Sequence, residues 1–229
     1  MAGLGRKVFT AGDVLTASDV QNYLMDQSVM VFAGTAARSS AIPTPTEGMT
    51  TYRADLDQLE SYDGTQWRVT NGMALLSTTT LSGASTTISG ISQSYKSLEV
   101  WIYGMTNATA NGVMRVEPNA DATACVLTGT SFSSSSAFRS SSNAQIKFNT
   151  ESVNRTNANN VARIRIDNYS NTTNYKPLTF NCFYVGVSTF DVAENYGGAI
   201  TLNTAISSLV ISNTGGNWST GTVEVWGVE

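Results

Sequence analysis

The sequence predicts a mainly β protein, with an N-terminal α-helix, a small β-meander collar and a C-terminal antiparallel β-sandwich that is jelly-roll-like. Three observations carry this prediction. From Met73 to the C-terminus, short alternating apolar and polar runs recur about every ten residues, between Gly, Asn and Ser. A clear helical period of 3.6 residues occurs in one segment, between Thr16 and Gly34. The step Asp63-Gly64 between two short runs is a hairpin signal, because Gly tolerates the positive φ of a tight turn.

Composition narrows the class of protein. The chain has 229 residues, enough for one good core and an accessory segment. Charged residues make up 13%, well below the usual ~25%, and Ser, Thr, Asn and Gly take their place. This composition is typical of extracellular or virion β-proteins. The net charge of −4 argues against a nucleic-acid groove, which needs clustered Lys and Arg, so we expect no nucleic-acid partner.

The residues that usually carry catalysis are sparse. The chain has no histidine, which removes the commonest general base and metal ligand. No local pattern brings two carboxylates together, since the candidates are scattered: Glu151, Asp167, Asp191 and Glu194. No phosphate-binding glycine loop and no activated serine motif is found. We therefore predict no enzyme activity, no catalytic residue, no cofactor and no metal site.

Two cysteines, Cys125 and Cys182, lie far apart in strands of apolar or small residues. Buried free thiols are the expectation, since free cysteine behaves as a small hydrophobic residue. A disulfide bridge between them stays open as an alternative at this stage. A CxxC spacing is absent, so the sequence indicates no redox or metal site.

The N-terminus carries Arg6-Lys7 without an apolar segment after it, so we expect no secretory signal. No run approaches the ~20 apolar residues that span a bilayer, and we expect no membrane insertion. The first 15 residues, with three glycines, are expected to be loose. The protein would then be made in a cytoplasm and carry no export address.

The helical segment begins at Thr16 or Ser18 as N-cap, with Thr16 and Asp19 at capping-box spacing, and ends at Gly34 after about four turns. Its apolar face is formed by five residues: Val20, Tyr23, Leu24, Met30 and Val31. This face could lie on the C-terminal domain of its own chain. Alternatively it packs on copies of itself or on another protein. We favour the second, because a Gly- and Pro-rich connector follows.

Residues 33 to 48 are that connector, expected to be extended because of Pro43 and Pro45. A meander of three very short strands follows, over 49–52, over 58–62 and at Trp67. So few residues cannot bury enough apolar surface to offset their ordering entropy. The meander is therefore expected to be stable when copies from neighbouring chains pack together, through Met49, Tyr52, Leu59, Tyr62 and Trp67.

The third part alternates as strands of a sandwich do. We expect strands over 86–91, 97–103, 112–117, 144–149, 161–166, 178–187, 199–202, 208–212 and 222–228. The aliphatic rows, such as Leu98, Val100 and Ile102, should face the core. Trp101, Tyr103 and Trp226 would then face outward, which suggests a further contact such as a subunit interface. The alternatives are that the faces are reversed or that these aromatics lie under loops.

A hydroxyl-rich stretch, 130–142, contains Phe132 and Phe138 and could hold a sugar. A flexible, solvated loop is the interpretation that we favour for it.

Three motifs together resemble proteins of tailed bacteriophages. The segment 9–32, beginning FTAGDVLTASDVQNYLM, resembles the leader of many phage structural proteins. The pattern Glu47-Gly48-Met49, Tyr52, Leu59, Tyr62-Asp63-Gly64 and Trp67 is similar to the small trimeric β-collar of tail fibres. The segment 91–98, ISQSYKSL, resembles the β-sandwich head that follows such collars. The resemblance implies a homotrimeric virion protein that docks by its N-terminus.

The resulting hypothesis divides the chain into three domains. Residues 1–34 are a virion-anchoring segment, 35–72 a connector and trimerising collar, and 73–229 a head that contacts the host. Expected partners are two further copies of the chain, other phage tail or head proteins at the N-terminus, and a host-surface glycan. The alternative is a capsid decoration or tail-assembly protein without a receptor-binding role. A glycan-cleaving spike ranks last.

Overall fold

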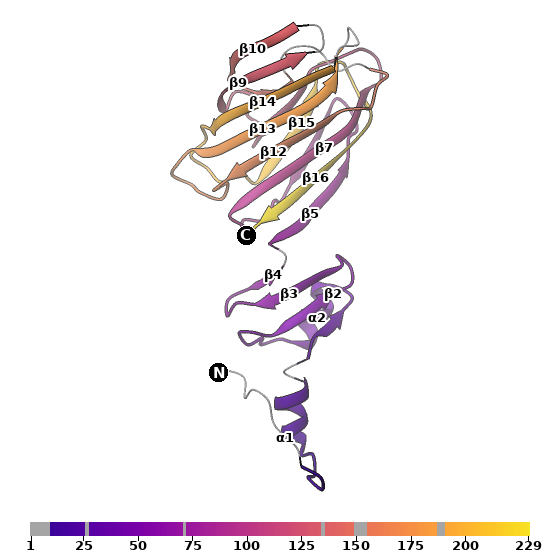
Figure 1. The fold of residues 1–229 in the computed structure, drawn as a ribbon, viewed down its shortest axis with the longest axis vertical. Coiled ribbons are helices and arrows are strands. Elements are labelled where there is room, and N and C mark those ends of the chain that lie inside the picture. The colour runs from indigo at the N-terminus through magenta and orange to yellow at the C-terminus, as the bar shows by residue number, and fades with distance from the viewer. Residues whose placement is uncertain (1–9, 26–27, 71, 134–135, 149–154, 187–190) are drawn as a thin grey trace. The chain divides into compact units, whose positions relative to one another are not determined.

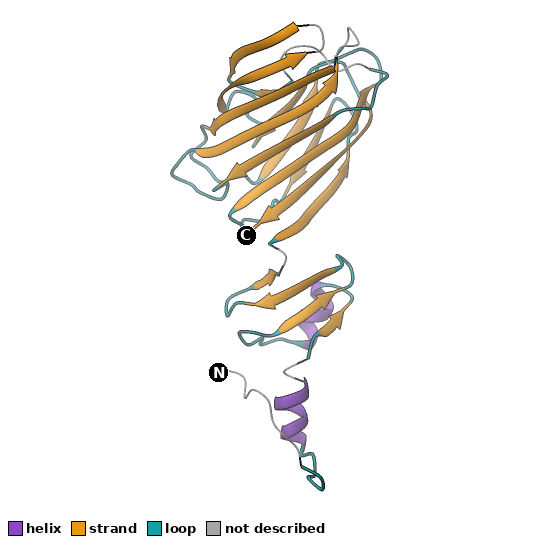
Figure 2. Ribbon diagram, in the orientation of Figure 1, coloured by secondary structure: helices purple, strands orange, loops and turns teal. Residues whose placement is uncertain are grey.

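The structure is a computed structural model that describes residues 10–25, 28–70, 72–133, 136–148, 155–186 and 191–229. The prediction of a mainly β protein with sandwich-like sheets is confirmed. The chain divides into two compact units, Met1–Ala74 and Leu75–Glu229, which we call the N-terminal unit and the head. Figure 1 labels their elements and Figure 2 separates helices from strands.

The N-terminal unit begins with the predicted capping box. The Thr16 side chain accepts a hydrogen bond from the Asp19 backbone N–H at 3.1 Å, and the Asp19 carboxylate accepts one from the Thr16 backbone N–H at 3.2 Å. Thr16 is therefore the N-cap. Helix α1 (Ala17–Asp19) continues as a π-helical segment, η1 (Val20–Met25).

The predicted four-turn helix to Gly34 is wrong in its second half. Strand β1 (Met30–Phe32) lies there and pairs in parallel with β2 (Thr50–Arg53). Val29-Met30-Val31-Phe32 is short and apolar, and a run of this kind fits a strand as well as a helix. The pairing with β2 decides, because it satisfies backbone groups of β1: the Ala54 N–H, for example, donates to the Phe32 carbonyl at 2.9 Å.

The predicted extended connector also contains a helix. Helix α2 (Thr35–Ala41) occupies half of the segment between residues 33 and 48. Ala36 and Ala37 favour helix, and Pro43 restricts Ile42 to the non-helical conformation at which α2 ends. The expectation of an extended path therefore applies after Ile42 alone.

The predicted three-stranded meander is present as β2, β3 (Gln58–Tyr62) and β4 (Trp67–Val69), and β1 adds a fourth strand. At the β3–β4 turn Gly64 adopts a φ of 92°. The Asp63 carboxylate accepts hydrogen bonds from the Thr65 hydroxyl at 2.6 Å and the Gln66 N–H at 2.8 Å. These bonds, with those from Thr65 N–H and Arg68, hold the pKa of Asp63 far below its usual value. Because β1 and β2 are neighbours in one sheet, the predicted boundary at 34/35 lies inside this unit.

The head is a jelly roll. Its first strand in the sequence pairs with its last, and the pairing continues with strands progressively closer to the middle of the chain. Nested pairs alternate between two sheets: β5 with β16 and β7 with β12 in one, β6 with β15 and β8 with β11 in the other. The hairpin β9–β10 and the pair β13–β14 are inserted and extend the first sheet to eight described strands, in the order β10-β9-β14-β13-β12-β7-β16-β5. The second sheet has the order β11-β8-β15-β6. Figure 1 shows both sheets in the head.

The bounds of the head strands are β5 (Met73–Thr80), β6 (Ser85–Ser89), β7 (Ser97–Asn107), β8 (Met114–Pro118), β9 (Cys125–Ser133), β10 (Ser136–Asn143), β11 (Ile146–Lys147), β12 (Val161–Asp167), β13 (Lys176–Val185), β14 (Asp191–Ile200), β15 (Ser208–Asn213) and β16 (Trp218–Val228).

The core lies between the two sheets, where the alternation placed it. Leu98, Val100 and Ile102 of β7 are completely buried, and so are Met114 of β8 and Ile211 of β15. The faces were therefore predicted in the right sense, with Trp101, Tyr103 and Trp226 opposite the core rows.

An aromatic stack lines the inner side of the extended sheet. Phe148 packs on Tyr184 with ring centroids 4.4 Å apart and on Phe180 at 6.4 Å, and Phe180 continues to Tyr196 at 6.2 Å. These rings are buried. The second sheet has fewer strands than the first. These large side chains therefore bury apolar surface on the inner side of β13 and β14.

Candidate interaction surfaces

The sheet of the N-terminal unit has a covered face and an open face. The covered face carries buried Thr51, Gln58, Glu60 and Val69, and Arg38 of α2 packs there. The open face carries one cross-strand row, Val31–Tyr52–Leu59, since Tyr52 pairs with Val31 on one side and Leu59 on the other. Val31 is 68% exposed and Leu59 40%. An apolar row of this kind on a small sheet is a candidate contact surface.

The five residues expected at the trimer interface separate between these faces. Tyr52 and Leu59 lie on the open face. Tyr62 and Trp67 are cross-strand partners on the covered face, with ring centroids 5.4 Å apart. Met49 precedes β2 and its carbonyl accepts from the Tyr62 N–H at 2.9 Å. Tyr62 and Trp67 thus have partners within their own chain.

A buried ionic network joins α2 to the sheet. The Arg38 guanidinium pairs with the Glu60 carboxylate, and both side chains are almost fully buried. The guanidinium carbon also lies 4.5 Å from the centroid of the Trp67 ring. Arg53 Nη1 lies 3.5 Å from the second oxygen of Glu60 and pairs with Asp55 at 2.6 Å. Burial lowers the pKa of Arg38. Sequence reasoning missed this network, because Arg38 and Glu60 carry no pattern that pairs them.

The five residues expected to form the virion anchor do not share one helix face. Val20 lies exposed in η1, and the side chains of Tyr23 and Leu24 fall outside the described residues. Met30 and Val31 belong to β1, and their side chains point to opposite faces of the sheet. Val31 therefore joins Tyr52 and Leu59 on the open face.

The outer face of the eight-stranded head sheet carries a dense polar and aromatic network. Glu99 is buried although it points away from the core, because Arg163 holds it with two hydrogen bonds of 2.7 and 2.9 Å. This pairing raises the pKa of Arg163. The Arg163 guanidinium also lies 5.2 Å from the Trp101 ring centroid. Arg165 approaches Glu99 at 3.4 Å and Asp167 at 2.8 Å.

Further across the same face, the two aromatics next to Glu224 are held by it. The Tyr103 hydroxyl donates a hydrogen bond to Glu224 Oε1 at 2.8 Å, and this bond raises the pKa of Tyr103. The Trp226 indole donates to the other Glu224 oxygen at 3.2 Å. On β13 and β14, the exposed amides of Asn181 and Asn195 bond to each other at 2.6 Å. Of the outward aromatics predicted from the sequence, Trp101 and Trp226 are thus half-buried, and Tyr103 is exposed.

The hydroxyl-rich stretch 130–142 is not the solvated loop that its composition predicts. It forms most of the β9–β10 hairpin, in which Ser140 pairs with Thr130. The side chains of 133 and 136–143, including Phe138, fall outside the described residues, whereas Phe132 is described and 47% exposed.

The scattered carboxylates stay scattered in the described part of the chain. Asp167 and Asp191 lie on the outer sheet face, and Glu151 falls outside the described residues. Glu194 is buried, with Cys182 Sγ and Tyr184 Oη each 3.5 Å from its oxygens. No group of three or more His, Cys, Asp or Glu suited to a metal ion occurs among the described residues. Within the same residues, no helix is long and apolar enough to cross a membrane.

The two cysteines are free and buried, so the expectation of free thiols is confirmed. Burial raises the pKa of Cys125 from 9.0 to about 12, and it raises the pKa of Cys182 well above 9.0.

This burial predicts a loss of stability at alkaline pH. The fold holds the thiols protonated, so their contribution is fully present below pH 9.0 and is lost as pH rises towards about 12, the folded-state value for Cys125. Urea unfolding at pH values on either side of 9.0 should show a falling free energy of unfolding, with a shallower fall for Cys125→Ala. Rapid reaction of both thiols with a disulfide reagent in the native protein near neutral pH would contradict the burial.

Comparison with protein-family models, with curated proteins and with solved structures found no match.

Proposed function

We propose that this chain is a structural protein of a tailed-phage virion, a homotrimeric short tail fibre or similar appendage. The N-terminal unit joins the chains and docks on other tail or head proteins, and the head contacts the host surface. The motifs of the leader, collar and head, given above, support this proposal. It carries no enzymatic step, no cofactor and no metal.

The observation that carries the proposal is the open face of the N-terminal sheet. Val31, Tyr52 and Leu59 form an apolar row on a unit whose other face is covered by α2 and includes the buried ion pair of Arg38 with Glu60. A unit of this size gains little from its own core, so association through the apolar face is a direct way to stabilise it. A trimer would place three such rows around one axis, out of water.

We expect Leu59→Asp to convert a trimer into monomers, because it would bury an unpaired carboxylate in the centre of the proposed interface. Light scattering coupled to size-exclusion chromatography on the full chain measures the mass directly. The particle formed by the unaltered protein should have three times the mass of a single chain.

The matched control is Leu56→Asp. Leu56 is 37% exposed against 40% for Leu59, and it lies outside the strands, in the turn between β2 and β3. This variant should keep the trimer mass. A monomeric unaltered chain would overturn the homotrimer, and equal effects of both substitutions would overturn the proposed interface.

The location in the particle separates the fibre from the alternative. Antibody labelling of phage particles in electron micrographs should mark the tail. Label spread over the capsid lattice would instead identify a decoration protein. Release of fragments from host-surface polysaccharide by purified protein would revive the glycan-cleaving alternative.

A further inference from the structure

We propose that the outer face of the large head sheet binds one extended, uncharged β-linked polysaccharide chain, which lies across the strands. This inference rests on the proposed function, since it names the class of host-surface ligand and the residues that hold it.

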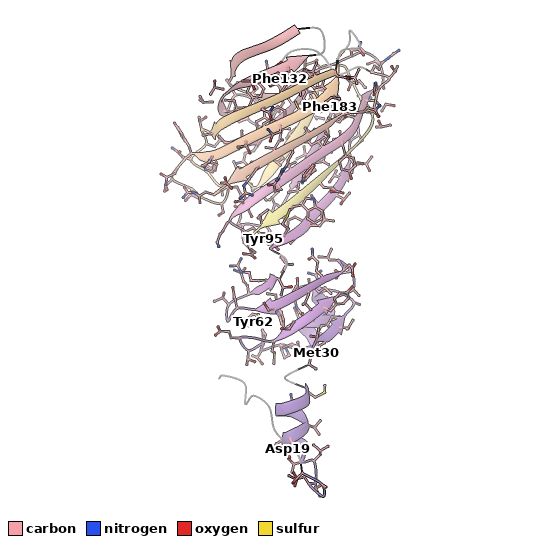
Figure 3. All side chains as sticks on the ribbon, viewed as in Figure 1. Asp19, Met30, Tyr62, Tyr95, Phe132 and Phe183 are labelled. Atoms are coloured by element: carbon pink, nitrogen blue, oxygen red, sulfur yellow. The ribbon has the colours of Figure 1, made fainter. Side chains whose placement is uncertain are left out.

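The surface is organised by one cross-strand row, which we call the aromatic row. Successive register pairs bring five residues from five strands side by side: Tyr103 (β7), Val161 (β12), Phe183 (β13), Ala193 (β14) and Phe132 (β9). Directly paired residues of neighbouring strands point to the same face. The three aromatic side chains are 39%, 40% and 47% exposed in the order of the row. Figure 3 labels Phe183 and Phe132 on the head.

The spacing of the aromatics is regular. Tyr103, Phe183 and Phe132 stand on every second strand, with the smaller Val161 and Ala193 between them. Neighbouring strands lie ~4.8 Å apart, so successive aromatics are about 10 Å apart. In an extended β-1,4-linked chain, each pyranose advances the chain by about the distance between neighbouring strands. Such a chain presents the same ring face at every second sugar. One chain that twists with the sheet can therefore stack a sugar on each aromatic.

The charges beside the row point to a ligand without charge. Glu224 next to it accepts from Tyr103 and Trp226, and Arg163 in the adjacent position on β12 is held by Glu99. A charged ligand would compete with these paired groups, and an anionic one would also be repelled by the exposed Asp191, two residues from Ala193 on β14. A ligand of neutral hydroxyls would not.

Hydroxyl groups of such a ligand meet suitable partners next to the aromatic row. A second cross-strand row lies next to the aromatic row, displaced from it by two residues along each strand. It contains the exposed amides of Asn181 and Asn195 and the partly exposed hydroxyl of Thr130. Amides both donate and accept hydrogen bonds, and so do sugar hydroxyls. Stacking on one row and hydrogen bonding to the next would orient the chain along both.

A second copy of the protein fits this surface less well. A stable protein interface buries ~800 Å² on each partner around an apolar centre several residues wide. The aromatic row is one residue wide, and amides and ion pairs flank it. Association of copies through the aromatic row would therefore contradict the proposal.

The test is calorimetric titration of the full chain with cellohexaose and chitohexaose, two uncharged β-1,4-linked hexamers. At least one should bind. Cellobiose or chitobiose should bind far more weakly, since a dimer cannot span from Tyr103 to Phe132. Maltohexaose, whose α-linkages coil the chain, should also bind more weakly. Phe183→Ala, in the middle of the row, should weaken hexamer binding about five- to tenfold.

The matched control is Tyr175→Ala. Tyr175 is 56% exposed and precedes β13, outside the aromatic row, so this variant should bind as the unaltered chain does. Phe132→Ala serves as a second row variant if Phe183→Ala does not fold, as judged by circular dichroism. Absence of hexamer binding, equal binding of dimers or maltohexaose, or unchanged binding by the row variants would overturn the inference. A change of oligomeric mass on Phe183→Ala would assign the row to a second copy and overturn it too. If the chain is trimeric and tail-located but binds no hexamer, this inference fails and the proposed function does not.

Discussion

Arg38→Ala is expected to lower the free energy of unfolding of the N-terminal unit by about 3–5 kcal/mol, because it leaves the Glu60 carboxylate buried without its closest cation. Arg53 remains 3.5 Å from Glu60 but is shared with Asp55, so it offsets this loss in part. Helix α2 also loses the stacking of Arg38 on Trp67. Hydrogen exchange of peptides from residues 35–69, followed by mass spectrometry, measures the effect locally.

The control for this prediction is Arg68→Ala in the same sheet. Arg68 pairs with Asp63 at 3.0 Å, but both side chains are about a third exposed, so the loss should be far smaller than for Arg38→Ala. A double variant, Arg38→Met with Glu60→Leu, should recover much of the stability, since no unpaired charge is left in the interior. Equal exchange in the Arg38 and Arg68 variants would show that the buried pair is not what holds α2.

Gly198→Ala is expected to destabilise the head by about 2–3 kcal/mol or more, because β14 and β9 approach too closely there for a side chain. A Cβ at Gly198 would overlap the Val126 carbonyl oxygen and stand 3.0 Å from the Leu127 Cα. These are backbone atoms of a paired strand and cannot move without breaking the ladder. Urea unfolding of the full chain measures the shift.

The neighbouring residue supplies the control. A Cβ at Gly197 would meet nothing within 4 Å, and its φ is not in the left-handed region. Gly197→Ala should therefore be neutral or stabilise by about 0.5 kcal/mol, since alanine loses less backbone entropy on folding. A similar loss in both variants would mean that the strands separate more easily than their register indicates.

Local signals in the sequence were reliable where the stabilising contacts are also local. Thr16 and Asp19 form the capping box at three residues' separation, and Asp63 organises its own turn. The alternation in β7 placed Leu98, Val100 and Ile102 in the core, because a strand with one buried face imposes a period of two. Each of these predictions needed a few neighbouring residues.

Predictions failed where a distant partner decides the conformation. The run around Val31 fits a helix or a strand, and parallel pairing with β2 selects the strand. Arg38 is buried because Glu60, far along the chain, lies opposite it. The aromatic row is the extreme case. Tyr103, Phe183 and Phe132 become neighbours through four strand registers, and a slip of one residue in any of them would turn a ring to the other face.

Local patterns in the sequence predict the mainly β class, the sandwich-like head, the three-stranded meander and the faces of aliphatic rows such as that of β7. These follow from periodicity and turn chemistry, which act between near neighbours. The tertiary structure alone decided which strands pair, which ions are buried and which aromatics share a surface. Those outcomes depend on register between segments far apart in the chain, and no local physical preference sets that register.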